Sequence, residues 1–189
     1  MITMKKLILV AAIAVSGVSN AQTFGLKAGA NVSSISNTDE SKSKFGFYGG
    51  AFVNIPLADT FSLQPEVLYN GKGVKSDGPD DISINLDYIS VPVMFQYKAT
   101  PQFYLEAGPE LSFLVSAKVK ADGNSADFKD FVNGFDFGVG LGAGYDFTAN
   151  FGANIRYVAG VTDIVKDNEG DDASRNGVFQ LGLTYKFGK

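Results

Sequence analysis

The chain has 189 residues and a formal net charge of −4, and it contains no cysteine and no histidine, whereas glycine (22) and phenylalanine (16) are abundant. This length fits one domain. The absence of cysteine excludes a disulfide framework and a thiolate metal site. The absence of histidine excludes hydrolases with a histidine general base and zinc sites built on histidine. The acidic balance argues against a nucleic-acid partner, because neutralising phosphates requires a basic face.

The first 21 residues predict a secretory signal peptide. Two lysines precede the apolar run 7–15, and the segment ends on the small-residue triplet 19–21. This order is typical of a cleaved signal peptide, so we expect the mature chain to start at Gln22. The alternative, a transmembrane anchor, is disfavoured because the apolar run is shorter than the about 20 residues that span a bilayer. We therefore divide the chain into a signal peptide, 1–21, and one domain, 22–189.

The domain alternates apolar and polar residues with a period of two. In the longest stretch, 103–120, one set of alternate residues is wholly apolar and the other is mostly polar or small. A period of two is typical of a β-strand, because successive side chains point to opposite faces. The stretch is far longer than the about 5–6 residues usual for a strand in a soluble protein. Such a strand suits a barrel wall between lipid and a polar interior.

Eight stretches share this alternation. They are residues 24–33, 45–57, 61–72, 82–97, 103–120, 135–147, 151–161 and 178–187. Long polar loops, including 121–132, alternate with short turns, and an aromatic residue lies near most short-turn ends. This pattern predicts an all-β fold, an eight-stranded antiparallel up-and-down transmembrane β-barrel with long extracellular loops and short periplasmic turns. A soluble lipocalin-like barrel is the alternative, and it would need polar outer faces.

The fourth stretch departs from a single alternating phase. Ile84 and Leu86 occupy one phase, whereas Ile89 and Val91 occupy the other. We predict a phase switch near Asp87, caused by a β-bulge or by a strand top that rises clear of the membrane.

Charged residues of both signs fall on the predicted inner faces. They are Lys27, Glu66, Lys72, Glu106, Glu110, Asp136, Arg156 and Lys186. Side chains fill the interior of an eight-stranded barrel, and buried charges need partners. We expect Arg156 to pair with a glutamate, and we predict a lumen ion network that closes the barrel. Its members are Glu66, Glu106, Glu110, Arg156 and Lys27. A conducting or proton-relaying lumen is the alternative.

The remaining motifs favour packing over chemistry. Glu106 and Glu110 are four residues apart on one strand, about 13 Å by strand rise, which exceeds the separation that glycoside hydrolysis uses. The glycine run 138–144 lacks the spacing of a dinucleotide-binding loop. We interpret it as room for bulky residues across the lumen. These are Tyr48, Phe52, Leu68, Met94, Tyr104 and Leu114.

The acidic run 167–172 lacks EF-hand spacing, so we interpret it as a solvated loop, with a calcium site as the alternative. Acidic loops would also bind the divalent cations that bridge lipopolysaccharide. The sequence predicts no enzymatic activity, no catalytic residue, no cofactor and no resident metal.

Several segments resemble a known family. They are Phe-Gly-Leu-Lys-Ala-Gly-Ala-Asn at 24–31, Leu-Gln-Pro-Glu-Val-Leu-Tyr at 63–69, Leu-Asp-Tyr-Ile-Ser-Val-Pro-Val-Met at 86–94 and Tyr-Leu-Glu-Ala-Gly-Pro-Glu at 104–110. Together they resemble the small Bacteroidetes "porin family" outer-membrane β-barrel domain, the PorT-like group. The resemblance covers the whole mature chain. It implies an outer-membrane barrel usually without an assigned biochemical role, and the word porin in the label does not establish conduction.

The sequence therefore predicts an integral protein of the cell outer membrane. We expect a closed structural or interaction barrel, and a narrow porin-like channel for ions or small solutes is the alternative. The expected partners are outer-membrane lipid and lipopolysaccharide, the outer-membrane assembly machinery, and a protein bound by the extracellular loops. The assembly machinery commonly reads a terminal aromatic residue. Here Phe187 precedes Gly188 and Lys189, so the signal would be shifted.

Overall fold

A computed structural model of the chain describes residues 22–36, 41–76, 82–121, 124–166 and 173–187. The predicted signal peptide, 1–21, lies outside these residues. No helix in the described ranges is long and apolar enough to cross a membrane.

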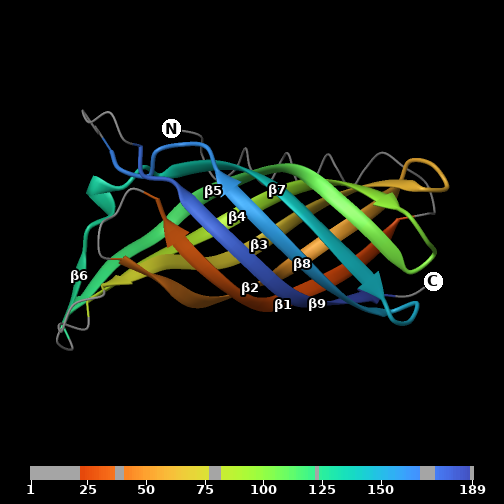
Figure 1. Cartoon of the computed structure of the whole chain (residues 1–189), viewed down its shortest axis with the longest axis horizontal. Coiled ribbons are helices and arrows are strands. Elements are labelled where there is room, and N and C mark those ends of the chain that lie inside the picture. The colour runs from red at the N-terminus through yellow and green to blue at the C-terminus, as the bar shows by residue number, and fades with distance from the viewer. Residues whose placement is uncertain (1–21, 37–40, 77–81, 122–123, 167–172, 188–189) are drawn as a thin grey trace.

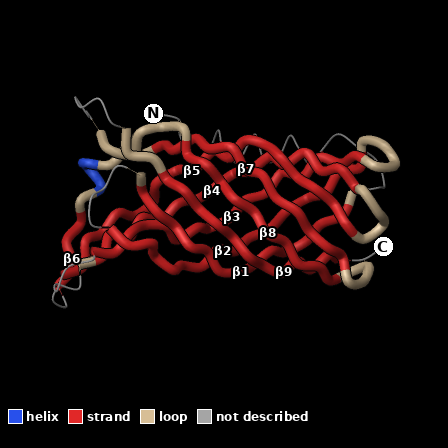
Figure 2. Tube along the Cα trace, viewed as in Figure 1, coloured by secondary structure: helices blue, strands red, loops and turns tan. Residues whose placement is uncertain are grey.

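Eight antiparallel strands close into a barrel (Figures 1 and 2). They are β1 (Thr23–Ile35), β2 (Ser41–Pro56), β3 (Phe61–Ser76), β4 (Ser83–Lys98), β5 (Phe103–Ala121), β7 (Phe135–Asp146), β8 (Phe151–Gly160) and β9 (Asn176–Phe187). Each of these strands pairs with the barrel strands before and after it in the chain, and β1 pairs with β9 to complete the circle. The predicted fold is confirmed.

The two ends of the barrel differ. Three tight connections, 57–60, 99–102 and 147–150, lie at one end, which we call the turn end (right in Figure 1). The hydroxyls of Thr100 and Thr148 accept hydrogen bonds from the backbone N–H groups three residues later, at 2.9 and 3.0 Å, and so stabilise two of these turns. The longer connections lie at the opposite end, the loop end.

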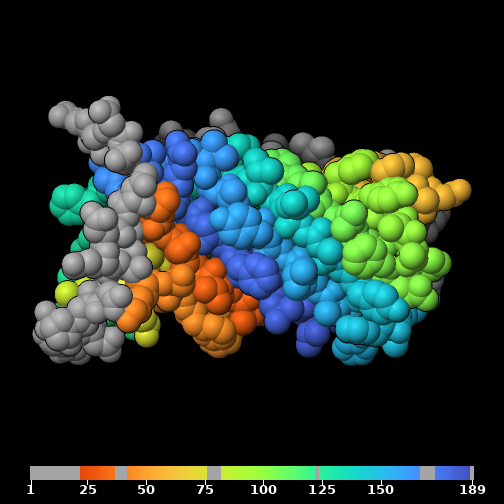
Figure 3. All heavy atoms as spheres, viewed as in Figure 1, coloured from red at the N-terminus to blue at the C-terminus, as the bar shows by residue number. Residues whose placement is uncertain are grey.

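The barrel is apolar outside and polar inside. Large side chains such as Phe47, Leu141 and Leu183 are 67%, 68% and 64% exposed on the outer face, whereas polar side chains such as Asn31, Asn70 and Gln180 are buried in the interior. Figure 3 shows this wall as a continuous surface on the face formed mainly by β1, β8 and β9. An apolar outer band around a polar interior is the reverse of a soluble barrel, so the lipocalin-like alternative is wrong.

A β-bulge interrupts the pairing of β4 with β5. Asp87 lies opposite Ser116, whereas the next residue, Tyr88, lies opposite Leu114. Val115 is therefore the extra residue, and it belongs to β5. A bulge at this level was predicted, but its assignment to the strand that contains Asp87 is wrong.

The bulge changes the phase of β5 toward the loop end. Ala117 is fully buried, whereas Lys118 and Lys120 are exposed on the outer face, opposite to the predicted alternation. The β4 strand keeps one phase, and its inward residues near the loop end are Leu86 and Tyr88. The mixed pattern that predicted a phase switch in β4 arises because its inner face is apolar near the loop end, whereas its outer face is polar there, at Asn85 and Asp87, and becomes apolar only from Ile89.

Part of the predicted loop 121–132 is ordered structure. The strand β6 (Asn124–Asp127) pairs with the end of β5, and the 3-10 turn η1 (Lys129–Phe131) follows it. Since β5 runs past the level where β7 begins, its backbone N–H and C=O groups at that edge need a partner, and β6 provides one.

Candidate functional site

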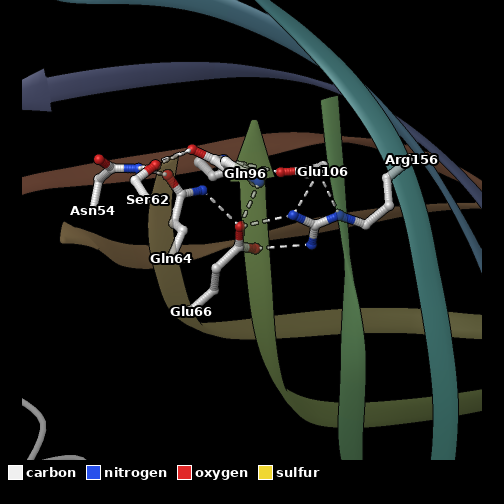
Figure 4. Close-up of polar contacts among 8 residues, drawn as sticks. Asn54, Ser62, Gln64, Glu66, Gln96, Glu106 and Arg156 are labelled. Carbon is white, nitrogen blue, oxygen red and sulfur yellow. Dashed lines mark hydrogen bonds and ion pairs between the residues drawn. The ribbon is translucent and has the colours of Figure 1, made fainter. Parts of the chain in front are cut away.

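The centre of the lumen holds a buried arginine bound by two carboxylates. Arg156 of β8 is 1% exposed, and its Nη1 and Nη2 donate to Oε2 and Oε1 of Glu66 on β3, at 2.9 and 2.8 Å. Its Nε donates to Oε1 of Glu106 on β5, at 2.8 Å. Lys27 of β1 donates to Oε1 of Glu66, at 2.7 Å. Figure 4 shows the two glutamates converging on the guanidinium group.

Neutral side chains extend this cluster toward the turn end (Figure 4). Gln96 donates to Oε2 of Glu106 at 3.0 Å, and Gln64 donates to Oε1 of Glu66 at 2.9 Å. Asn54 then donates to Oε1 of Gln96 at 2.8 Å. We call Arg156, Lys27, Glu66, Glu106 and these three amides the Arg156 network. Its two cations balance its two carboxylates, and such charge-assisted bonds are what make buried ions tolerable.

The fifth predicted member, Glu110, lies in a different cluster nearer the loop end. Its Oε1 is 3.3 Å from Nζ of Lys72, and Ser112 donates to the same oxygen at 3.2 Å. Nζ of Lys72 is also 3.7 Å from Oδ2 of Asp136, which accepts a hydrogen bond from Asn176 at 2.7 Å. We call these residues the Lys72 cluster. One lysine here faces two carboxylates, so the cluster carries an excess of negative charge when all three groups are ionised.

A separate ion pair lies at the turn end. Lys186, which was expected inside the lumen, pairs with Asp146 at 2.5 Å, and both side chains remain about one-fifth exposed. They border a cavity of about 370 Å³ that is also lined by Asn54 and Tyr104. This end of the lumen is therefore polar and open to solvent.

An apolar cluster closes the loop end from inside, and we call it the apolar cap. It consists of Ile35, Val74, Leu86, Tyr88, Leu114, Ala117, Val132 and Ile164. Val132 and Ile164 belong to connecting segments that fold over the mouth, where the backbone N–H of Asn133 donates to the carbonyl of Ile164 at 2.9 Å. Alternation did not reveal this cap, because four of its members, Ile35, Val74, Val132 and Ile164, lie in segments predicted as polar loops.

Inward glycines make room for large side chains, as predicted. A Cβ atom at Gly144 would collide with the ring of Tyr104, and one at Gly140 would lie 2.7 Å from Cε of Met94. A Cβ atom at Gly182 would collide with Tyr48 in the same way. The glycine run is therefore part of the packing of the lumen.

The buried acidic side chains of the described residues bind cations of the protein itself. In the described ranges, no group of three or more acidic side chains is placed to hold a metal ion. Glu106 and Glu110 bind different cations, Arg156 and Lys72. The acidic run 167–172 lies outside the described residues.

Comparison with known proteins agrees with this architecture. Residues 20–166 match the family described as "Outer membrane protein beta-barrel domain". A search of curated proteins finds no significant match.

Two solved structures illustrate the likeness of fold. One is Ail, the attachment invasion locus protein of Yersinia pestis, in complex with the heparin analogue sucrose octasulfate. It is 14% identical, with a TM-score of 0.57 over 89% of this chain and 100% of Ail. The other is Neisserial surface protein A, 19% identical, with a TM-score of 0.59 over 89% of this chain and 100% of that protein. The family match covers most of the sequence, and the strands enclose a polar lumen within an apolar wall. The chain therefore belongs to the outer membrane protein beta-barrel domain family and is an integral barrel of the cell outer membrane.

Proposed function

We propose that this protein is a closed barrel that acts through its surface, as a structural or interaction protein of the outer membrane, without transport or catalysis. The observation that carries this proposal is that the lumen is blocked at two levels. The Arg156 network crosses its centre, and the apolar cap covers its extracellular end, since long loops mark that side in this class of barrel.

The two barriers resist passage for different reasons. A solute or ion would have to separate Arg156 from carboxylates at 2.8 to 2.9 Å, which exposes unpaired charges in a poorly hydrated space. The apolar cap offers no hydrogen bonds from its aliphatic side chains, and hydrophobic constrictions exclude water and ions by dewetting. Either barrier alone would oppose conduction.

Single-channel recording in planar bilayers tests this proposal. The refolded protein is first shown to be a folded barrel by its faster gel migration before heating than after it. We expect no stable open level across ±100 mV, at protein doses where a general porin gives reproducible steps. A stable conductance level would overturn the closed barrel.

The rival proposal is a narrow channel for ions or small solutes, and one observation favours it. The side chain of Gln180 is fully buried, and neither its amide nitrogen nor its amide oxygen has a hydrogen-bond partner among the described residues. Buried polar groups normally bind protein or water. Water at Gln180 would make part of the lumen hydrated, but that space would still end at the apolar cap. The conductance measurement decides between the two proposals.

The proposal also covers lineage and partners. The segments that resemble the porin family support a place in the PorT-like group of Bacteroidetes, and the apolar outer wall supports contact with outer-membrane lipid and lipopolysaccharide.

The alternating aromatics Tyr185 and Phe187 support recognition by the outer-membrane assembly machinery. Replacing both with alanine should reduce the amount of heat-modifiable barrel in the outer membrane. Unchanged assembly would contradict that partner.

A further inference from the structure

Outward-facing lysines of the barrel gather on one side of its extracellular end. Lys42 on β2, Lys75 on β3, and Lys118 and Lys120 on β5 are all exposed. We call these four residues the lysine face. In the described parts of β1, β7, β8 and β9, the lysines and arginine point into the lumen or its mouth. Among the described strands the lysine face is thus one-sided, in a chain whose net charge is −4. The exposed Lys166 and Arg175 lie outside the strands, in the connection between β8 and β9.

The strand register brings these charges close together. Lys42 lies directly opposite Lys75. Ser83 of β4 lies opposite Lys75 on one side and opposite Lys120 on the other. Neighbouring strands are about 4.8 Å apart, so the backbones at Lys75 and Lys120 are separated by about 10 Å. Like charges directly opposite each other destabilise a sheet, so this row does not serve the stability of the barrel itself.

A fifth lysine lies beside the row. Lys44 is half-buried, and its Nζ donates to the carbonyl of Lys72 at 3.0 Å. Burial lowers the pKa of Lys44, Asp87 opposes that change, and the charges of Lys120 and Lys75 add to it. These ammonium groups are therefore near enough to repel one another. Among the described neighbours, the acidic residues Asp87 and Asp127 offset only part of this positive charge.

The position of the lysine face along the barrel axis, relative to the lipid-facing band, indicates the chemistry of its ligand. The outward residues Tyr69, Ile89 and Phe113 on β3, β4 and β5 are apolar and mark the lipid-facing band. Lys118 lies opposite Asn85, four residues along β4 from Ile89, which is about 10 Å higher for a strand tilted by about 45°. The side chain also projects away from the lumen. Such positions meet the headgroups of the outer leaflet, where phosphorylated saccharides supply fixed negative charge.

We propose that the lysine face binds the phosphate groups of lipopolysaccharide in the outer leaflet. Lysines act as point charges toward phosphate, and ammonium groups spaced over about 5 to 10 Å across adjacent strands would contact a headgroup with more than one phosphate. This inference deepens the proposed function, and it requires only that the barrel lies in the outer membrane. It does not depend on whether the lumen conducts.

Thermal unfolding of the refolded barrel in a neutral detergent tests the site, because a ligand that binds only the folded state raises the melting temperature. The probes are bisphosphorylated lipid A, its monophosphorylated form and phosphatidylethanolamine. We expect bisphosphorylated lipid A to raise the melting temperature most and phosphatidylethanolamine least. High salt should weaken the effect. Equal shifts with all three lipids would overturn the proposal.

The variants locate the site on the barrel. In the lysine-face variant, Lys75→Ser, Lys118→Ser and Lys120→Ser are combined, and we expect at least half of the lipid A shift to be lost. A control with Lys98→Ser, Lys166→Ser and Arg175→Ser removes the same charge elsewhere and should keep the full shift. A variant with arginine at the three face positions should also keep it, provided that all variants show barrel-type gel migration. Equal losses in the control and lysine-face variants would overturn the proposal.

Soluble anions provide the last comparison. Inorganic phosphate and heparin should give little shift at concentrations where lipid A saturates. If heparin alone protects the native barrel and lipid A does not, the face binds a soluble polyanion and the lipid proposal is wrong. Conductance recordings on the same preparations keep this result separate from the closed-barrel proposal.

Discussion

Arg156 and Glu66, 90 residues apart in the chain, form a two-point ion pair in which the two terminal nitrogens of the guanidinium donate to different oxygens of one carboxylate, at 2.8 and 2.9 Å. The pair joins β8 to β3 across the lumen. Since Arg156 also binds Glu106, a single side chain holds two buried carboxylates in place.

Replacing Arg156 with alanine should therefore destabilise the barrel strongly. Glu66 would keep Lys27, but Glu106 would lose its cation. We expect a loss of about 3–5 kcal/mol in the free energy of unfolding, the range found when one partner of a buried ion pair is removed. Urea unfolding in lipid vesicles measures this loss. The exposed Arg175→Ala provides the control, with an expected change within about 0.5 kcal/mol. Similar stability of both variants would mean that the Arg156 network is not structural.

The two lumen clusters should respond differently to loss of a carboxylate charge. In the balanced Arg156 network, Glu106→Gln leaves a cation in excess. In the Lys72 cluster, Glu110→Gln leaves one cation and one carboxylate, and the amide still accepts hydrogen bonds. We expect Glu106→Gln to cost about 2–4 kcal/mol and Glu110→Gln less than about 1 kcal/mol. Matched unfolding curves check this difference, and equal losses would contradict the charge assignment.

The packing of the lumen can be tested at a single glycine. Gly144→Ala would place a methyl group in the ring of Tyr104, whereas no atom lies within 4 Å of the Cβ position at Gly134. We expect Gly144→Ala to destabilise the barrel by about 1–3 kcal/mol, as overpacking does, and Gly134→Ala to leave it nearly unchanged. Heat-modifiable migration at increasing temperature compares the two. If they melt together, Tyr104 relaxes freely and the lumen is loosely packed.

The two barriers to conduction lie in series. Replacing Leu86 and Ile164 with serine makes the apolar cap polar, but the Arg156 network still fills the centre. We expect this double variant to remain closed in planar bilayers and to open only when Arg156→Gln is added. Stable openings in the double variant alone would show that the network does not block ions.

Sequence alternation predicted which residues face the lumen, but it did not predict their positions along the barrel axis. It placed Lys27, Glu66, Glu106, Glu110 and Arg156 inside the barrel, because a period of two fixes which side of the wall a residue occupies. It did not separate Glu110 from the Arg156 network. Contacts across the lumen depend on the stagger between strands, which is a property of the closed barrel.

The other differences between the sequence predictions and the structure have local causes. The extra residue Val115 reverses the phase of β5, so that Ala117 turns inward and Lys118 outward. A period-two count does not detect this bulge, because the apolar alternation of the sequence continues past Val115 through Ala117 and Val119. The strand β6 was missed because Asn124–Asp127 has no apolar face, and backbone pairing with β5 alone orders it. The apolar cap was missed because Ile35, Val74, Val132 and Ile164 are isolated apolar residues in polar segments.

The unequal strand lengths have a consequence within the plane of the membrane. The β5 strand has 19 residues and continues into the pairing with β6, whereas β8 has only 10. A symmetric cylinder presents the same surface to its neighbours in every orientation. This barrel instead has a tall side at β5 and a short side at β8. A neighbouring membrane protein on the β5 side would contact the long β5 strand and the β6 strand paired with it. A neighbour on the β8 side would contact only a short strand. The contacts of the barrel with other membrane proteins therefore depend on its rotational orientation about the membrane normal.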